Sequence, residues 1–307
     1  MPNGKGTARP FGCGWAVGLG FLLLLVGAVL LAHDCFDNKY TLGAIVFGAH
    51  LFAVALIVVG LGAVVSKTWG GFMLASRNAY SLSKLQMALW TIVVLAALLT
   101  AAEINIFATF GDMPTDPEHA SKLIEPLAIV IPGELLAAMG IAAFSFGAAP
   151  TVLAMKASQT PADGQADAAI KRVAANTGVQ SEQITNIGNV IARSDKQHAR
   201  LSDIVTGDEL ANAGTIDLSK VQQLLVTLLL IGTYIAMLFA TFTAGRAITT
   251  LPALGDRFVE LMALSHGSYL AYKAVPKSGQ PTPVDPSANN GDRTTPKMQG
   301  IAAATPP

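Results

Sequence analysis

Residues 15–32 read WAVGLGFLLLLVGAVLLA, a run of 18 residues without a charged side chain. A helix needs about 20 mainly apolar residues to cross the hydrocarbon core of a bilayer, so this run has the composition of a membrane span. Lys5 and Arg9 precede it, as in a signal peptide. However, the run is longer than a typical signal core, and Ala32-His33-Asp34-Cys35 is a poor cleavage site. We expect an uncleaved first span.

More apolar runs follow, and together they decide the class of protein. They are Leu42–Val65, Met87–Phe107, Leu127–Met155 and Leu224–Thr243, with a weaker sixth, Phe258–Val275, interrupted by Glu260, His266 and Lys273. The chain is 52% hydrophobic and only 13% charged, whereas soluble domains carry roughly 25% charged residues. The sequence therefore predicts an all-α, polytopic membrane protein with about six transmembrane helices.

Charges between the runs orient the predicted bundle. The segment between spans two and three carries the cations Lys67, Arg77 and Lys84 and no acid. The next connection is acidic, with Asp112, Asp116, Glu118 and Glu125. Because cytoplasmic loops carry the excess of Lys and Arg, we expect a multi-pass protein of a bacterial cytoplasmic (inner) membrane with its N-terminus inside. Six spans place the C-terminus inside as well, whereas five would place it outside.

Four regions are expected along the chain. Residues 1–155 hold spans one to four, 156–220 form a polar helical insert on the cytoplasmic side, 221–276 hold spans five and six, and 277–307 form a disordered tail rich in Pro, Gly and Ser. Within the insert, Ala166–Ala175 and Ser181–Arg193 are predicted to be helices that form a hairpin near the membrane or a partner.

Two span entries resemble each other. Residues 81–86 read SLSKLQ and residues 217–222 read DLSKVQ, with Thr91 and Thr227 at the same offset. We interpret spans three–four and five–six as parallel helical-hairpin repeats. The alternative is that a favourable interfacial helix start arose twice. In either case Gln86 and Gln222 are expected just inside the membrane, where a neighbouring helix can satisfy their amides.

The same stretches also resemble a group of known proteins. YSLSKLQMALWT (80–91), GDELANAGTIDLSKVQQLLVTLLL (207–230) and LMALSHGSYLAYKAVPK (261–277) are similar to segments of bacterial multi-pass membrane proteins that are usually left uncharacterised. The resemblance covers roughly residues 80–277. It implies a membrane location and supports the repeat, and it brings no activity, ligand or catalytic residue.

Three ionisable residues inside the predicted spans are candidates for an ion or ligand site. His50, Glu103 and Glu134 fall at similar depths near the outer boundary. Intramembrane charges are costly and therefore often functional, so adjacent helices would bring an imidazole and carboxylates together as in a proton or cation site. The alternative, which we favour, is that both glutamates are hydrated at the interface and His50 makes a single hydrogen bond.

Other side chains are assigned packing roles. Ser265 and His266 are neighbours on a helix, where their side chains do not face each other, so His266 is predicted to be a polar residue of a helix interface. Gly14 and Gly18 form a G-x-x-x-G pair, which suits packing within the chain or, alternatively, between copies in a homo-oligomer. Cys13 and Cys35 would lie on opposite sides of the bilayer and cannot pair. No catalytic, metal, cofactor or nucleic-acid motif is present.

Two functions are favoured over a third, an intramembrane enzyme. The first is a non-enzymatic anchor or scaffold in the lipid bilayer, which binds a protein partner through residues 156–220. The second is a small transporter or channel that uses His50, Glu103 and Glu134. The spans contain few polar residues to line a water-filled path, so we favour the anchor.

Overall fold

The computed structural model describes residues 14–32, 39–111, 125–244, 246–275 and 277. Five of the helices in these ranges are long and apolar enough to cross a bilayer: α1 (Gly14–Ala32), α2 (Lys39–Ser66), α3 (Leu82–Gly111), α5 (Gly133–Ala157) and α7 (Leu218–Phe242). The chain is therefore a multi-pass helical membrane protein. Outside the described residues lie Lys5, Arg9, Cys13, Cys35, Asp112, Asp116, Glu118 and most of the tail.

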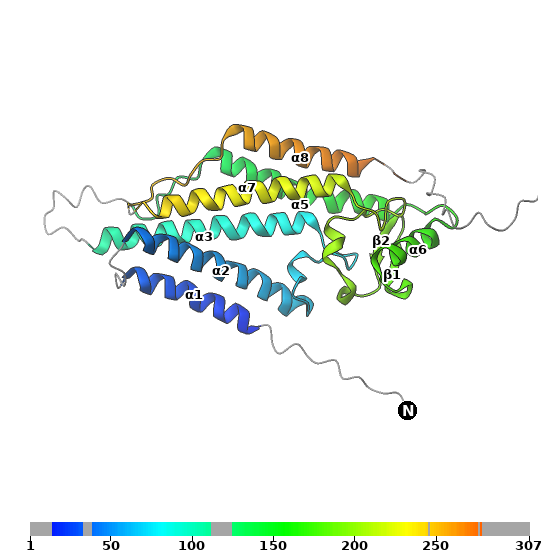
Figure 1. The fold of residues 1–307 in the computed structure, drawn as a ribbon, viewed down its shortest axis with the longest axis horizontal. Helices are drawn as coiled ribbons and strands as arrows, with labels where there is room; N and C mark the ends of the chain where they lie inside the picture. Colours follow the sequence, from blue (N-terminus) through cyan, green and yellow to red (C-terminus); the bar gives the residue numbers. More distant parts are fainter. Residues whose placement is uncertain (1–13, 33–38, 112–124, 245, 276, 278–307) are drawn as a thin grey trace, which may run out of the picture.

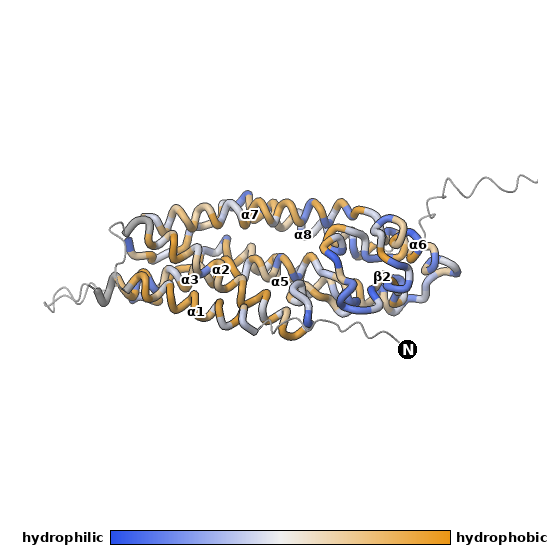
Figure 2. Tube along the Cα trace, turned by 60° about the horizontal axis from the view of Figure 1, so that its bottom comes forward, coloured by the Kyte–Doolittle hydropathy of each residue, from blue (hydrophilic) through white to orange (hydrophobic). Residues whose placement is uncertain are grey.

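The long helices lie side by side in one elongated bundle, with the polar segment 158–217 gathered at one end (Figure 1). We call this segment the cap. Hydrophobic residues run along the helices, whereas hydrophilic residues concentrate in the cap (Figure 2). Helices α3 and α7 begin at the cap end and α5 ends there, so the cap can contact several helix termini at once.

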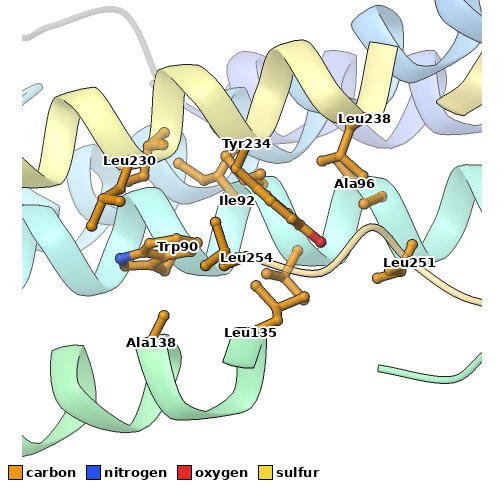
Figure 3. Packing of buried hydrophobic residues seen from close by; sticks show 14 of the residues in the cluster. Trp90, Ile92, Ala96, Leu135, Ala138, Leu230, Tyr234, Leu238, Leu251 and Leu254 are labelled. Atoms are coloured by element: carbon orange, nitrogen blue, oxygen red, sulfur yellow. The ribbon is translucent and has the colours of Figure 1, made fainter. Parts of the chain in front are cut away.

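The bundle core is apolar and contains large aromatic side chains. The rings of Trp90 in α3 and Tyr234 in α7 lie 6.2 Å apart between centroids, and both side chains are almost fully buried. Leu135 and Ala138 of α5 and the loop residues Leu251 and Leu254 close around them (Figure 3). Burying such side chains contributes about 1.5–3 kcal/mol each.

Glycines bring α1 and α2 into close contact, but not the pair that the sequence suggested. A Cβ at Gly20 would lie 2.6 Å from the Ile57 side chain, and one at Gly60 would lie 2.8 Å from Val17. Gly14 and Gly18 have open space around them. The G-x-x-x-G pair therefore makes no close helix contact within the described chain.

Helix α5 begins later than the predicted fourth span. Pro132 is its N-cap, with an extended ψ of 147°, and residues before a proline avoid helical conformation. The strand-like segment ahead of it pairs in parallel with the segment before the last helix: the Val130 amide donates to the Thr249 carbonyl at 2.9 Å, and the Leu251 amide donates to the Val130 carbonyl at 3.0 Å. Helices α3 and α7 begin earlier than predicted, α7 with Asp217 as N-cap.

The weak sixth run is a helix, α8 (Asp256–Ala274), which packs along α5 and α7. It is not among the five apolar candidate spans. Its low hydropathy has two sources: exposed charges at its start, Asp256, Arg257 and Glu260, and polar residues on its buried face, Ser265, His266 and Lys273.

The cap is a mixed structure rather than the predicted helical hairpin. Helix α6 (Gln165–Thr177) matches the first expected helix. Residues 181–193 instead form a 3-10 turn followed by an antiparallel hairpin, β1 (Ile184–Ile187) and β2 (Val190–Arg193). The β-branched residues favour strands, and Gly188 adopts a φ of +53° in the two-residue turn. The cap has a small core of its own: Ala169, Val173, Val179, Ile184, Ile191, Leu210 and Ala213.

Candidate functional site

His50 and Glu103 meet inside the bundle. His50 is fully buried, and its Nε2 lies 3.3 Å from Oε2 of Glu103, whose side chain is 13% exposed. The expected hydration of Glu103 at the interface therefore does not match the structure. The imidazole Nδ1 lies 2.9 Å from the Thr100 hydroxyl, which itself donates to the Ala96 carbonyl. Since that hydroxyl proton is used, Nδ1 can donate to the Thr100 oxygen, whereas His50 Nε2 and Glu103 Oε2 make no hydrogen bond among the described residues.

Glu134 does not join this pair. It lies in the first turn of α5 and is half-buried. Among the residues that the structure describes, it makes no hydrogen bond or ion pair with His50 or Glu103. The three-residue site suggested by similar depths in sequence is thus a two-residue contact between α2 and α3.

A second polar cluster lies inside the bundle near the starts of α3 and α7, and it joins α3, α5, α7 and α8. The Gln86 amide donates to the Thr227 hydroxyl at 2.7 Å, and the Gln223 amide donates to Gln86 Oε1 at 3.0 Å. The same Gln223 nitrogen lies 3.2 Å from Nδ1 of His266, which also lies 2.7 Å from the Ser145 hydroxyl. These side chains are buried, so the network fixes how the four helices pack.

The interface glutamine of α7 is Gln223, not the predicted Gln222. Gln222 is exposed, whereas Gln223 is fully buried. Successive helical residues project about 100° apart, so a shift of one position turns an amide from the interior to the surface. His266 and Gln86 are buried, and each lies next to Gln223 of α7. The sequence match pairs Gln86 with Gln222, but Gln86 is buried whereas Gln222 is exposed.

At the cap end, a buried carboxylate gathers three cations. Asp208 Oδ1 accepts from Arg77 Nη2 at 2.5 Å and from Lys220 Nζ at 2.7 Å, and Oδ2 accepts from Lys273 Nζ at 2.6 Å. Arg77 precedes α3, Lys220 begins α7 and Lys273 ends α8. One side chain of the cap thus holds three separate parts of the bundle.

The neighbouring residue extends this junction to α5. Glu209 Oε1 accepts from Lys156 Nζ at 2.7 Å, and Lys277 Nζ lies 3.2 Å away. Lys156 also donates to the carbonyls of Lys273 and Val275 at the end of α8. A lysine near a helix C-terminus satisfies carbonyls that have no partner within the helix. The adjacent pair Asp208 and Glu209 therefore binds the cap to α5, α7 and α8.

The charge state of Asp208 follows from these neighbours. Burial by itself would raise the pKa of its carboxyl, but the charges of Arg77, Lys220 and Lys273 hold that pKa well below its usual range. Asp208 is therefore ionised at neutral pH. Removing one partner of a buried ion pair costs about 3–5 kcal/mol, because the other charge is left uncompensated.

This junction was not predicted from the sequence. Lysines at the ends of apolar helices are explained equally well by contact with lipid headgroups, so Lys156, Lys220 and Lys273 gave no distinctive signal. One signal was present: Asp208 and Glu209 are adjacent acids between two helices that each carry a terminal lysine. The partners lie 53 and 65 positions apart, a separation that only the fold can close.

No protein-family model, curated protein or solved structure matches the chain. No group of three or more His, Cys, Asp or Glu side chains that could hold a metal ion occurs among the described residues. The cap junction and the His50–Glu103 pair are therefore the candidate functional sites.

Proposed function

We propose that this chain is an anchor or scaffold of a bacterial cytoplasmic membrane, and that its cap binds a partner protein. The observation that supports this is the junction at Asp208 and Glu209. Ion pairs to several helix ends hold the cap in one orientation relative to the bundle. A docking platform needs such a fixed orientation, because a partner's binding surface is then presented without an ordering cost.

The proposal includes six spans with both termini and the cap on the cytoplasmic side. Two features support it. Helix α8 packs beside α5 and α7. Arg77 binds Asp208 of the cap and Lys84 lines the same cavity as Asp208, so these cations lie at the cap end, as the positive-inside rule expects of a cytoplasmic face.

We also retain the proposal of two parallel hairpin repeats, α3–α5 and α7–α8. The parallel pairing of Val130 with Thr250 supports it, because equivalent segments would meet in this way about a common axis. The two second helices also end alike: Lys156 reaches Glu209 and Lys273 reaches Asp208. The different environments of Gln86 and Gln222 count against a strict residue-by-residue match.

Site-specific photocrosslinking in intact membranes tests the anchor. A photoreactive residue replaces Lys171 or Leu201, which are exposed on the cap, and Leu228 serves as the control on the exposed face of α7. The cap positions should give a protein adduct of the same mass, whereas Leu228 should give none. Absence of any protein adduct from both cap positions would reject the anchor.

The His50–Glu103 contact supports a second candidate, the movement of a proton or cation. A buried imidazole 3.3 Å from a carboxylate is the kind of pair that such a path uses. Against a continuous path, the packed layer around Trp90 and Tyr234 lies in the bundle core. The anchor is therefore our first proposal.

A further inference from the structure

A cavity of about 280 Å3 lies between the cap and the ends of the helices. Its apolar wall comes from one face of α5, where Ala149, Pro150, Leu153 and Ala154 line it. Its polar wall comes from the segment around Arg77, the start of α3, and the ends of α7 and α8. Since a water molecule takes about 30 Å3 of liquid volume, the cavity has room for a polyatomic group.

The polar wall carries an excess of positive charge. Arg77, Lys84, Lys220 and Lys273 line the cavity, and Asp208 is the single acid among the lining residues. Three of these cations already share the Asp208 carboxylate. Glu209, next in the chain, is shared between Lys156 and Lys277. Buried cations without a matching anion are costly, so this arrangement favours a bound anion.

Several donors on this wall still have capacity. Arg77 is 8% exposed, and its buried Nε has no hydrogen-bond partner among the described residues. Tyr269 accepts from Lys273 Nζ at 2.8 Å, so its own hydroxyl proton is free to be donated. Lys84 donates to the Leu74 carbonyl at 2.6 Å, and an ammonium has three N–H groups.

We propose that this cavity binds a phosphate-class anion, either the headgroup of an anionic phospholipid or free inorganic phosphate. A phosphate offers several acceptor oxygens to a cluster of Lys and Arg donors. The apolar face of α5 beside these donors suits a group that is charged at one end and apolar at the other. This inference does not depend on the cap having a protein partner.

Thermal unfolding of the solubilised full chain measures this binding. The probes are dioctanoyl phosphatidylglycerol against dioctanoyl phosphatidylcholine, and inorganic phosphate against chloride at equal ionic strength. We expect the anionic lipid or phosphate to raise Tm and the matched probe to have no effect. Stabilisation by the lipid alone identifies a headgroup, whereas stabilisation by phosphate, with competition between the two, identifies the free anion.

Lys84→Gln is the decisive variant, and Lys67→Gln is its matched control. Lys67 donates to the Val64 carbonyl of α2, and Lys84 donates to the Leu74 carbonyl ahead of α3, but only Lys84 lines the cavity. Losing one charged donor should weaken apparent affinity about tenfold or more. Lys84→Arg should keep the affinity, and Lys67→Gln should not change it. Ala154→Phe, which fills the cavity without removing a charge, should abolish the shift.

Four results would overturn the proposal. Two concern the probes: equal stabilisation by phosphatidylcholine and phosphatidylglycerol without an effect of phosphate, or equal stabilisation by chloride and phosphate without an effect of the anionic lipid. The other two concern the variants. They are an equal loss of affinity in Lys84→Gln and Lys67→Gln, and a full Tm shift in Ala154→Phe. If Lys84→Gln fails to fold, Ala154→Phe gives the same decision alone, because the cavity's charges are unchanged in that variant.

Discussion

The ammonium of Lys273, in the last turn of α8, lies 2.6 Å from a carboxylate oxygen of Asp208 in the cap, and both side chains are buried. This contact joins the last helix of the bundle to a loop that precedes α7. Arg77 and Lys220 bind the same carboxylate, so the position of α8 and that of the cap depend on one residue. Stability of the capped bundle should therefore be most sensitive to change at Asp208.

Replacing Asp208 with Asn should destabilise the protein by about 3–5 kcal/mol, because three buried cations lose their shared counter-charge. Thermal unfolding of the solubilised protein and protease cleavage in the segment before α6 both report it, as a lower Tm and faster cutting. Asp163→Asn removes an exposed carboxylate from that segment and should stay within about 0.5 kcal/mol of the parent. Equal effects of the two substitutions would show that the junction does not hold the cap.

The contribution of Asp208 should depend on pH with a definite sign. Its pKa in the folded protein is lowered, so the ionised form stabilises the fold at all pH values above the unfolded pKa of about 3.9. That stability is lost as the pH falls through the lowered pKa. The difference in Tm between the parent and Asp208→Asn should thus be constant above about pH 5 and shrink below about pH 4. A difference that disappears between neutral pH and about pH 6 would contradict this assignment.

The buried polar network near the starts of α3 and α7 makes a sharp prediction about neighbouring residues. Gln223→Leu should cost about 1–2 kcal/mol, because Gln86 and His266 would each lose a buried partner. Gln222→Leu, one position earlier and exposed, should have an effect close to zero. Thermal unfolding compares the two variants directly. A larger loss for Gln222→Leu would place the helix interface where the sequence first suggested.

Much of the architecture could be predicted from composition, and the reason is physical. A bilayer demands long apolar helices, so uncharged runs such as Trp15–Ala32 mark them without knowledge of their neighbours. The start of α5 was missed because an apolar run continues through Leu127–Ile131, although Pro132 ends the extended segment there. Apolar composition indicates whether a residue is surrounded by lipid or by water, but it does not determine the residue's backbone conformation.

The candidate site was predicted less well, because it depends on which helices are adjacent. His50 and Glu103 were identified from their depth alone, and their contact required α2 and α3 to be neighbours. Glu134 has a similar depth on a helix that does not bring it to them. For residues 181–193, the isoleucines Ile184, Ile187 and Ile191 fit both a helical face and a hairpin, and Gly188 decides for the hairpin.

The proposed six-span topology predicts on which side of the membrane each reporter position lies. An export-dependent reporter fused after Lys277 should be silent, and the same reporter placed at Pro114 should be active, because one position is cytoplasmic and the other is outside in our proposal. A fusion after Ala157, which is also cytoplasmic in our proposal, should be silent as well. Activity at the C-terminus would reduce α8 to a helix that does not cross the membrane.

Glu103 separates the two proposed functions. If the chain moves a proton or cation, Glu103→Gln removes the carboxylate that faces His50 Nε2 at nearly constant shape, and proton or cation flux into liposomes should be abolished. Glu134→Gln is the matched control, since Glu134 lies in the first turn of α5 outside this contact, and flux should be unchanged.

If the chain is an anchor, neither substitution should alter the photocrosslinked adducts at Lys171 and Leu201, because the cap is held by Asp208 and Glu209 at the other end of the bundle. We expect the anchor's result: no flux from the parent protein, and intact adducts in both variants. Flux that depends on Glu103 but not on Glu134 would reverse the order of the two proposals, since the packed layer around Trp90 and Tyr234 would then have to open during transport.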